Sequence, residues 1–208
     1  MRFKAVLFFL LLLFLSQTVF AQSAEEDGET ALMRAAACGR AEIVEALLNK
    51  GAKLEAKDEG GHTALLVAFS GALVADVPAE ARRSFIDESE DLATCTDAIP
   101  GGHQRVIRLL IARGANVNIR ATDRGETPLV IAATLGAVEL VRLLLEHDVD
   151  VNQKSWDDDT VLQWLKNIDA ALSEPHAEED QALYEWLRAT APGRAEIVRL
   201  LRQAGAKR

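Results

Sequence analysis

The sequence predicts an all-α fold, a solenoid of repeated helix pairs. Four segments resemble one another, because each opens with a glycine and continues with apolar residues at helical spacing: 39–52, 102–115, 136–149 and 193–206. Thr-x-Leu tripeptides come before them, and their threonines are spaced by 33 residues from Thr30 to Thr63 and again from Thr127 to Thr160. Aromatic residues make up only 5% of the chain, which is low for the strands of an all-β domain. A fixed period of this length is typical of a solenoid with a helix pair in each repeat.

Each glycine-led segment is expected to form an amphipathic helix that ends at a left-handed glycine. Three of the four segments close on Gly-Ala, and the exception carries Asp148 where the others have glycine. The helix before each segment is expected to start at the threonine, whose side chain caps it. Pro128 would then occupy a first turn, where a missing N–H costs nothing.

Two repeats are longer than the others. Inserts of 30 and 24 residues, at 72–101 and 168–191, separate the two helices of repeats two and four. Each insert contains a stretch with helical spacing, 78–92 in the first and 178–189 in the second, where Leu183, Trp186 and Leu187 share one face. Because inserts at one position of a repeat map to one face, we expect both to project from the same end of the stack.

The repeats resemble those of the ankyrin family, in which a β-turn finger precedes two antiparallel helices. Repeat three is the best copy, with Thr127-Pro128-Leu129, Ala132-Ala133, Gly136, Leu143-Leu144 and Val151-Asn152 in family positions. The resemblance implies four helix-turn-helix repeats with two helical inserts, at about 25–57, 58–121, 122–154 and 155–208. The frequent family histidine of the first helix is absent, and Asp158 replaces the finger glycine of repeat four.

The first 21 residues are expected to be a signal peptide rather than part of the fold. Arg2 and Lys4 precede an unbroken apolar run of 11 residues, Ala5 to Leu15, and Val19 and Ala21 suit a cleavage site before Gln22. The alternative, a membrane anchor, is disfavoured because 11 helical residues span only ~16 Å, about half of a bilayer core. The domain would then be 22–208, exported to an oxidising compartment, a bacterial periplasm or alternatively the exterior of the cell.

The acidic charge balance argues against binding to nucleic acid and to anionic lipid. The formal net charge is -9, and removing a leader with two basic and no acidic residues lowers it to -11. Nucleic-acid backbones and anionic lipid surfaces both need clustered positive charge on the protein. We therefore expect no nucleic-acid partner and no stable membrane insertion after cleavage.

No catalytic, cofactor-binding or metal-binding residues are predicted. The sequence contains no HExxH, GxSxG or phosphate-binding glycine loop, and no CxxC pair. Asp148 to Asn152 begin like a calcium loop, but Gln153 stands where an EF-hand needs glycine. The resemblance assigns His103, directly after the repeat glycine, to packing. An enzyme with a site formed by the inserts remains the less favoured alternative.

The resemblance implies a non-enzymatic protein that binds a protein partner through its fingers and concave face, or, as a second reading, a secreted effector that acts on another cell's proteins. Carried over position by position, the partner-binding residues are Lys57, Glu59, His62, Asp123, Arg124, Glu126, Lys154, Trp156, Asp157 and Asp159. Trp156 is of special interest because tryptophan is enriched at binding hot spots, although it could instead pack on a neighbouring finger or insert.

The two cysteines are expected to form a disulfide. Cys38 ends the first helix of repeat one, and Cys95 lies in the insert that replaces the equivalent turn of repeat two. Adjacent repeats stack side by side, so both sulfurs should lie at the same end of the solenoid, and an oxidising destination favours pairing. The alternative is a buried Cys38 and an unrelated, exposed Cys95.

Overall fold

The computed structural model describes residues 28–77, 101–121, 125–155, 158–173 and 181–207. Within these ranges the chain forms helices joined by turns, with one isolated β-bridge between Lys154 and Thr160. The helices are α2 (Gly28–Ala37), α3 (Ala41–Asn49), α4 (Ala64–Asp76), α6 (Gly102–Ala112), α7 (Pro128–Thr134), α8 (Val138–Glu146), α9 (Val161–Ala171), α10 (Gln181–Ala189) and α11 (Ala191–Gln203).

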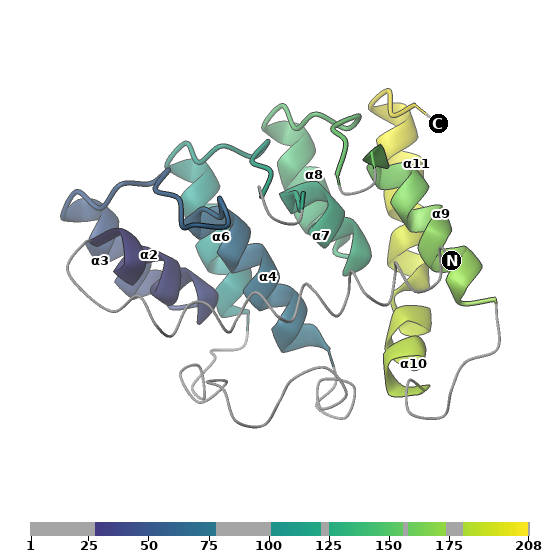
Figure 1. Ribbon diagram of the computed structural model, residues 1–208, viewed down its shortest axis with the longest axis horizontal. Coiled ribbons are helices and arrows are strands. Elements are labelled where there is room, and N and C mark those ends of the chain that lie inside the picture. The colour runs from purple at the N-terminus through teal and green to yellow at the C-terminus, as the bar shows by residue number, and fades with distance from the viewer. Residues whose placement is uncertain (1–27, 78–100, 122–124, 156–157, 174–180, 208) are drawn as a thin grey trace.

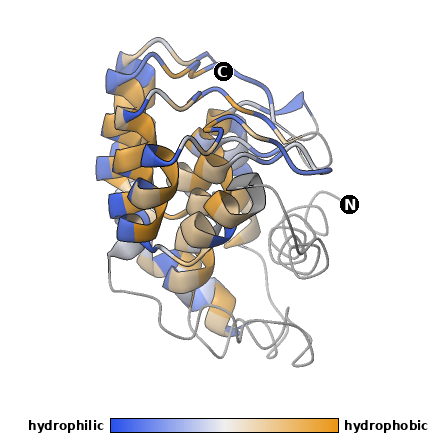
Figure 2. Cartoon of the chain, turned by 90° about the vertical axis from the view of Figure 1, so that its left-hand side faces the viewer, coloured by the Kyte–Doolittle hydropathy of each residue, from blue (hydrophilic) through white to orange (hydrophobic). Residues whose placement is uncertain are grey.

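The helices form two layers that run the length of the molecule (Figure 1). The first helices, α2, α4, α7 and α9, make one layer, and the second helices, α3, α6, α8 and α11, make the other. Apolar side chains meet between the layers, while hydrophilic residues line the outer side of the second helices (Figure 2). A single hydrophobic core runs through all four helix pairs. The predicted four-repeat helical solenoid is confirmed.

The threonine caps are only partly as predicted. Thr127 Oγ1 accepts a hydrogen bond from the Val130 N–H at 3.3 Å, as an N-cap does. Thr63 and Thr160 stand at the N-cap positions of α4 and α9 but make no capping bond. The prediction is wrong for Thr30, because α2 already starts at Gly28 and includes this residue.

The helices flanking both inserts are longer than predicted. α4 continues to Asp76 and α9 to Ala171, so each first helix extends into the predicted insert. In α4 the reason is its apolar continuation, since Leu73 and Val74 are buried. The second insert contains α10, which buries Leu183, Trp186 and Leu187 as its spacing predicted. The predicted helix in 78–92 lies outside the described residues.

Two pairs of glycines allow consecutive repeats to approach closely. A Cβ added at Gly39 would lie 2.8 Å from the backbone nitrogen of His103, and one added at Gly136 would lie 2.7 Å from the carbonyl oxygen of Thr190. Gly102 and Gly193 face these glycines, and a Cβ at either would overlap the opposing carbonyl group. Both contacts join a repeat without an insert to the following repeat with one.

Asp148 occupies a backbone conformation that favours glycine. Its φ is 55°, and the corresponding glycines at the ends of the other second helices have φ of 90° (Gly51), 87° (Gly114) and 90° (Gly205). An L side chain in this region crowds the following carbonyl, and a carboxylate at a helix C-terminus also meets the negative end of the helix dipole. Repeat three therefore carries local strain that the other repeats avoid.

Replacing Asp148 by glycine should stabilise the protein. Relief of the left-handed strain should raise the free energy of unfolding by about 1 kcal/mol. Part of this gain is lost because glycine has more conformational freedom than aspartate in the unfolded chain. Thermal unfolding should show the melting temperature rising by up to about 2–4 °C. The matched change Gly114→Asp should lower it, and a destabilised Asp148→Gly protein would contradict this account.

Candidate partner-binding surface

The fingers are short turns along one edge of the stack, the upper edge in Figure 1. Backbone hydrogen bonds close each of them: the Asp58 N–H donates to the His62 carbonyl at 3.1 Å, the Ala121 N–H to the Glu126 carbonyl at 3.0 Å, and the Ser155 N–H to the Asp159 carbonyl at 2.9 Å. The two ends of each finger are therefore held together by a backbone hydrogen bond.

A row of side-chain hydrogen bonds connects each repeat to the next at this edge. The acceptors are equivalent positions, a few residues after each second helix. The bonds run from the Asn116 N–H to Glu55 Oε1 (2.8 Å), from the Asp150 N–H to Asn118 Oδ1 (2.7 Å) and from the Lys207 N–H to Asn152 Oδ1 (2.7 Å). This row fixes the spacing of the fingers, which a rigid binding edge needs.

The predicted finger residues fall into three groups. Lys57, Glu59 and Lys154 are exposed, and Asp159 is partly exposed. His62 and Glu126 are buried, with 5% and 0% of their surface exposed. The remaining four lie outside the described residues: Asp123, Arg124, Trp156 and Asp157.

His62 supports the finger from inside instead of presenting a surface. Its Nδ1 lies 3.0 Å from both carboxylate oxygens of Asp58, and its backbone N–H donates to Asp58 Oδ1 at 2.8 Å. Burial acts to raise the pKa of Asp58, but the hydrogen bonds from His62 outweigh it and hold that pKa below its ordinary value. His62 and Glu126 occupy the same repeat position, directly after the finger glycine and before the threonine, and this position points into the stack. Neither is available to a partner.

The middle of the concave face offers few side chains. Every residue of α7 is buried, and so are the residues of α4 from Ala64 to Gly71. Exposed side chains of the first helices occur instead at the two ends of the stack, as with Arg34 in α2 and Lys166 in α9. The exposed side chains that a partner could reach therefore lie along the finger edge and at the two ends of the concave face.

His103 ties the first insert-bearing repeat to repeat one. Its Nε2 lies 2.7 Å from the Ala37 carbonyl oxygen at the end of α2, and the ring is only 8% exposed. Burial lowers the pKa of His103, although the hydrogen bond to Ala37 acts to raise it. The neutral ring therefore donates to Ala37, and the packing role expected for His103 is what its contacts indicate.

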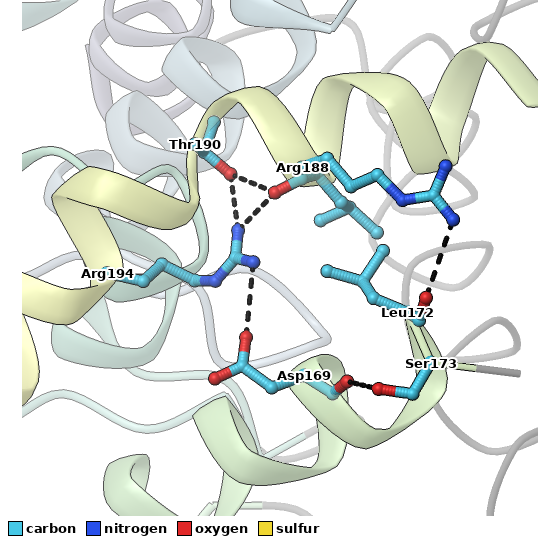
Figure 3. A network of polar contacts seen from close by, with 7 residues as sticks. Asp169, Leu172, Ser173, Arg188, Thr190 and Arg194 are labelled. Carbon is cyan, nitrogen blue, oxygen red and sulfur yellow. Dashed lines mark hydrogen bonds and ion pairs between the residues drawn. The ribbon is translucent and has the colours of Figure 1, made fainter.

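Arg194 has the corresponding position in repeat four and anchors the second insert (Figure 3). The guanidinium is 2% exposed and donates to the Leu187 carbonyl at 2.6 Å, to Thr190 Oγ1 and to Asp169 Oδ1 at 3.3 Å. It thereby joins α9, α10 and α11. Both insert-bearing repeats thus carry a buried polar side chain directly after the glycine of the second helix. Sequence analysis missed Arg194, although its shared position with His103 was a usable signal.

Within the described residues, no three His, Cys, Asp or Glu side chains gather as metal ligands would. No helix in these ranges combines the length and the apolarity needed to cross a bilayer.

These features define a helical repeat protein with a rigid polar edge, a class that serves protein interaction. The chain belongs to the ankyrin-repeat family: a model of three ankyrin repeats matches residues 4–76 and 95–155. Ankyrin repeats are protein-interaction modules, and the family is typically non-enzymatic.

The chain is similar to parts of much longer proteins. It is 31% identical over 173 residues to the nuclear factor NF-kappa-B p105 subunit of Gallus gallus, covering 76% of this chain and 18% of that protein. It is 40% identical over 72 residues to the transient receptor potential cation channel subfamily V member 5 of Oryctolagus cuniculus, covering 29% and 10%. It is 36% identical over 110 residues to the human ankyrin repeat and KH domain-containing protein 1, covering 50% and 4%. The chain spans less than a fifth of each relative.

His103 should make the stability of the protein depend on pH. Because its pKa is lowered in the folded state, the unfolded chain binds the proton more readily, and stability is lost as the pH falls below the ordinary value of 6.5. Urea unfolding of the native protein and of His103→Gln between pH 8 and pH 5 should show a shallower decline for the variant. Parallel declines would mean that protonation of His103 does not oppose folding.

Proposed function

We propose that this protein is an exported, non-enzymatic module that binds a protein partner through the finger edge. The observation that carries the proposal is the row of inter-repeat hydrogen bonds from Glu55, Asn118 and Asn152, which holds finger backbones rigid while side chains at their tips stay exposed. A preorganised surface of this kind pays little ordering entropy when a partner binds.

The exposed finger residues suit a polar partner surface that carries both signs of charge. Lys57 and Glu59 stand together on one finger, and Lys154 Nζ lies 3.5 Å from Asp158 Oδ2 on another. Ion pairs as exposed as Lys154–Asp158 contribute little to stability, so a partner can exchange them for its own contacts at small cost. Charges at such an edge set specificity and association rate more than raw affinity.

Trp156, in the finger of repeat four, is proposed as the hot spot of this edge. The residues on either side of it in the sequence, Ser155 and Asp158, belong to the finger, and this supports the proposal. A second tryptophan of repeat four, Trp164, is buried and donates from Nε1 to Thr134 Oγ1 at 2.9 Å. The two residues therefore offer a matched pair, one for binding and one for packing.

Truncation of Trp156 should weaken partner binding without unfolding the protein. With a partner recovered from the native exported fraction, Trp156→Ala should cost about 2 kcal/mol or more of binding free energy, as hot-spot truncations do. Trp164→Ala should instead lower the melting temperature. If Trp156→Ala binds normally when folded but melts early, Trp156 is a packing residue and the proposed edge loses its centre.

Export is proposed from the leader, with the periplasm as the compartment and 22–208 as the working chain. The disulfide between Cys38 and Cys95 is part of this proposal. Cys38 is 8% exposed at the end of α2, beside Gly39, which faces Gly102. Cys95 precedes Gly102 by seven residues, a length of chain that reaches at most about 25 Å and so permits the pairing. In the chain-entropy model this bond would stabilise the fold by roughly 4 kcal/mol, less any strain.

Intact-mass measurement tests cleavage and disulfide together. Protein recovered from the exported fraction should begin at Gln22 and be lighter by two hydrogen atoms before reduction than after it. Retention of residues 1–21 would overturn the cleavage, and an unchanged mass on reduction would overturn the disulfide. The two results are independent of each other.

A further inference from the structure

The first face of the stack exposes apolar residues that every other repeat buries. Ile43 in α3 is 44% exposed, and it is the one exposed large hydrophobic residue among those that the structure describes. Its equivalents in the later second helices are 0–2% exposed: Val106, Leu140 and Ile197. Leu47, one turn further along α3, is partly exposed, whereas its equivalents Leu110, Leu144 and Leu201 are fully buried.

α3 has two flanks with different occupants. Glu42 and Glu45 lie on the flank that faces α6, where they bind Arg105 (3.4 Å) and Arg113 (3.0 Å). Ile43 and Leu47 lie on the opposite flank, since they are about half a turn away from Glu45 around the helix. In repeats two and four the preceding second helix, α3 or α8, packs on that side of α6 or α11. An occupant in the same place would have to present an apolar helix face to Ile43 and Leu47.

The C-terminal end of the stack exposes a polar residue where the other second helices have apolar ones. The residues equivalent to Leu48 of α3 are Ile111 in α6 and Leu145 in α8, and both pack against the core. In α11 the equivalent residue is Arg202, which is exposed. Terminal repeats of solenoids need such polar outer faces for solubility. The C-terminal face thus carries a polar cap, and the N-terminal face keeps the apolar residues of an internal interface.

We propose that the apolar segment Ala5–Leu15 of this same chain covers the Ile43–Leu47 face until the leader is removed. Residues 8–16 precede α3 by 33 residues, the length of one repeat. In the sequence, this segment therefore occupies the position that the second helix of a preceding repeat would have. The ankyrin-repeat match begins at residue 4 and runs unbroken to residue 76. Phe9, Leu12 and Leu15 correspond to the flank of α3 that faces the next repeat, and all three are apolar.

A second copy of the chain fits this face less well. Two α3 helices packed antiparallel about their centres would bring Arg40 of one copy to Lys50 of the other. Within the stack, Glu45 of one second helix pairs with Arg113 of the next. In a head-to-tail pair of chains the same two positions would be occupied by Arg199 of one copy and Lys50 of the other, which are both positive. Like charges oppose both arrangements. The leader segment brings no charge to these positions.

Hydrogen exchange tests the contact on the intact chain, synthesised without export machinery, against the chain 22–208. The amides of Ala41–Asn49 should exchange about tenfold more slowly in the intact chain, because covering Ile43 removes apolar surface from water. Ile43→Ser should abolish this difference. The matched control Ile197→Ser should speed exchange of α11 equally in both chains, since Ile197 is buried in either.

Equal exchange of the α3 amides in the two chains would overturn the proposal. So would slow exchange that appears in the chain 22–208 only at high concentration, because a second copy would then be the occupant. The proposed contact does not depend on the proposed export. If the leader were never cleaved, the cleavage proposal would be wrong, but the leader would still cover the Ile43–Leu47 face.

Discussion

The stack depends on how closely the backbones of consecutive repeats can approach. Gly39 against Gly102, and Gly136 against Gly193, remove the Cβ atoms that would hold the second helices apart. Once the backbones are this close, the apolar faces of neighbouring helices meet and form one core through all four repeats. The finger contacts from Asn116 to Glu55 and from Lys207 to Asn152 lie at the same two boundaries between repeats.

Much of the fold could be predicted because its signals are local and repeated. The 33-residue spacing, the glycines and the apolar periodicity each depend on a single helix or turn, and α10 followed from Leu183, Trp186 and Leu187 alone. The starts of the inserts were misplaced because α4 and α9 continue on residues that are buried by tertiary packing, which the family pattern does not include.

The surface was harder to predict, because exposure depends on neighbours that the sequence does not place. His62 and Glu126 carry the polar side chains expected at a binding edge, yet their position turns inward beside the next helix. Arg194 was given no role from the sequence, because its burial requires α9 and α10 to close around it. Polar side chains at equivalent repeat positions thus serve either the surface or the interior, depending on what packs over them.

The anchoring of the inserts has a consequence for how such a protein can change. His103 lies after the first insert and fastens the returning chain to Ala37, outside the variable segment, whereas Arg194 binds Asp169, Leu187 and Thr190 within the second insert. Between two fixed ends, doubling the length of a flexible loop costs only about 0.6 kcal/mol. The first of these turns can therefore accept a longer, shorter or wholly different segment, which makes it a natural grafting point for a new recognition loop. The second turn is less free, because Leu183, Trp186 and Leu187 of α10 belong to the core.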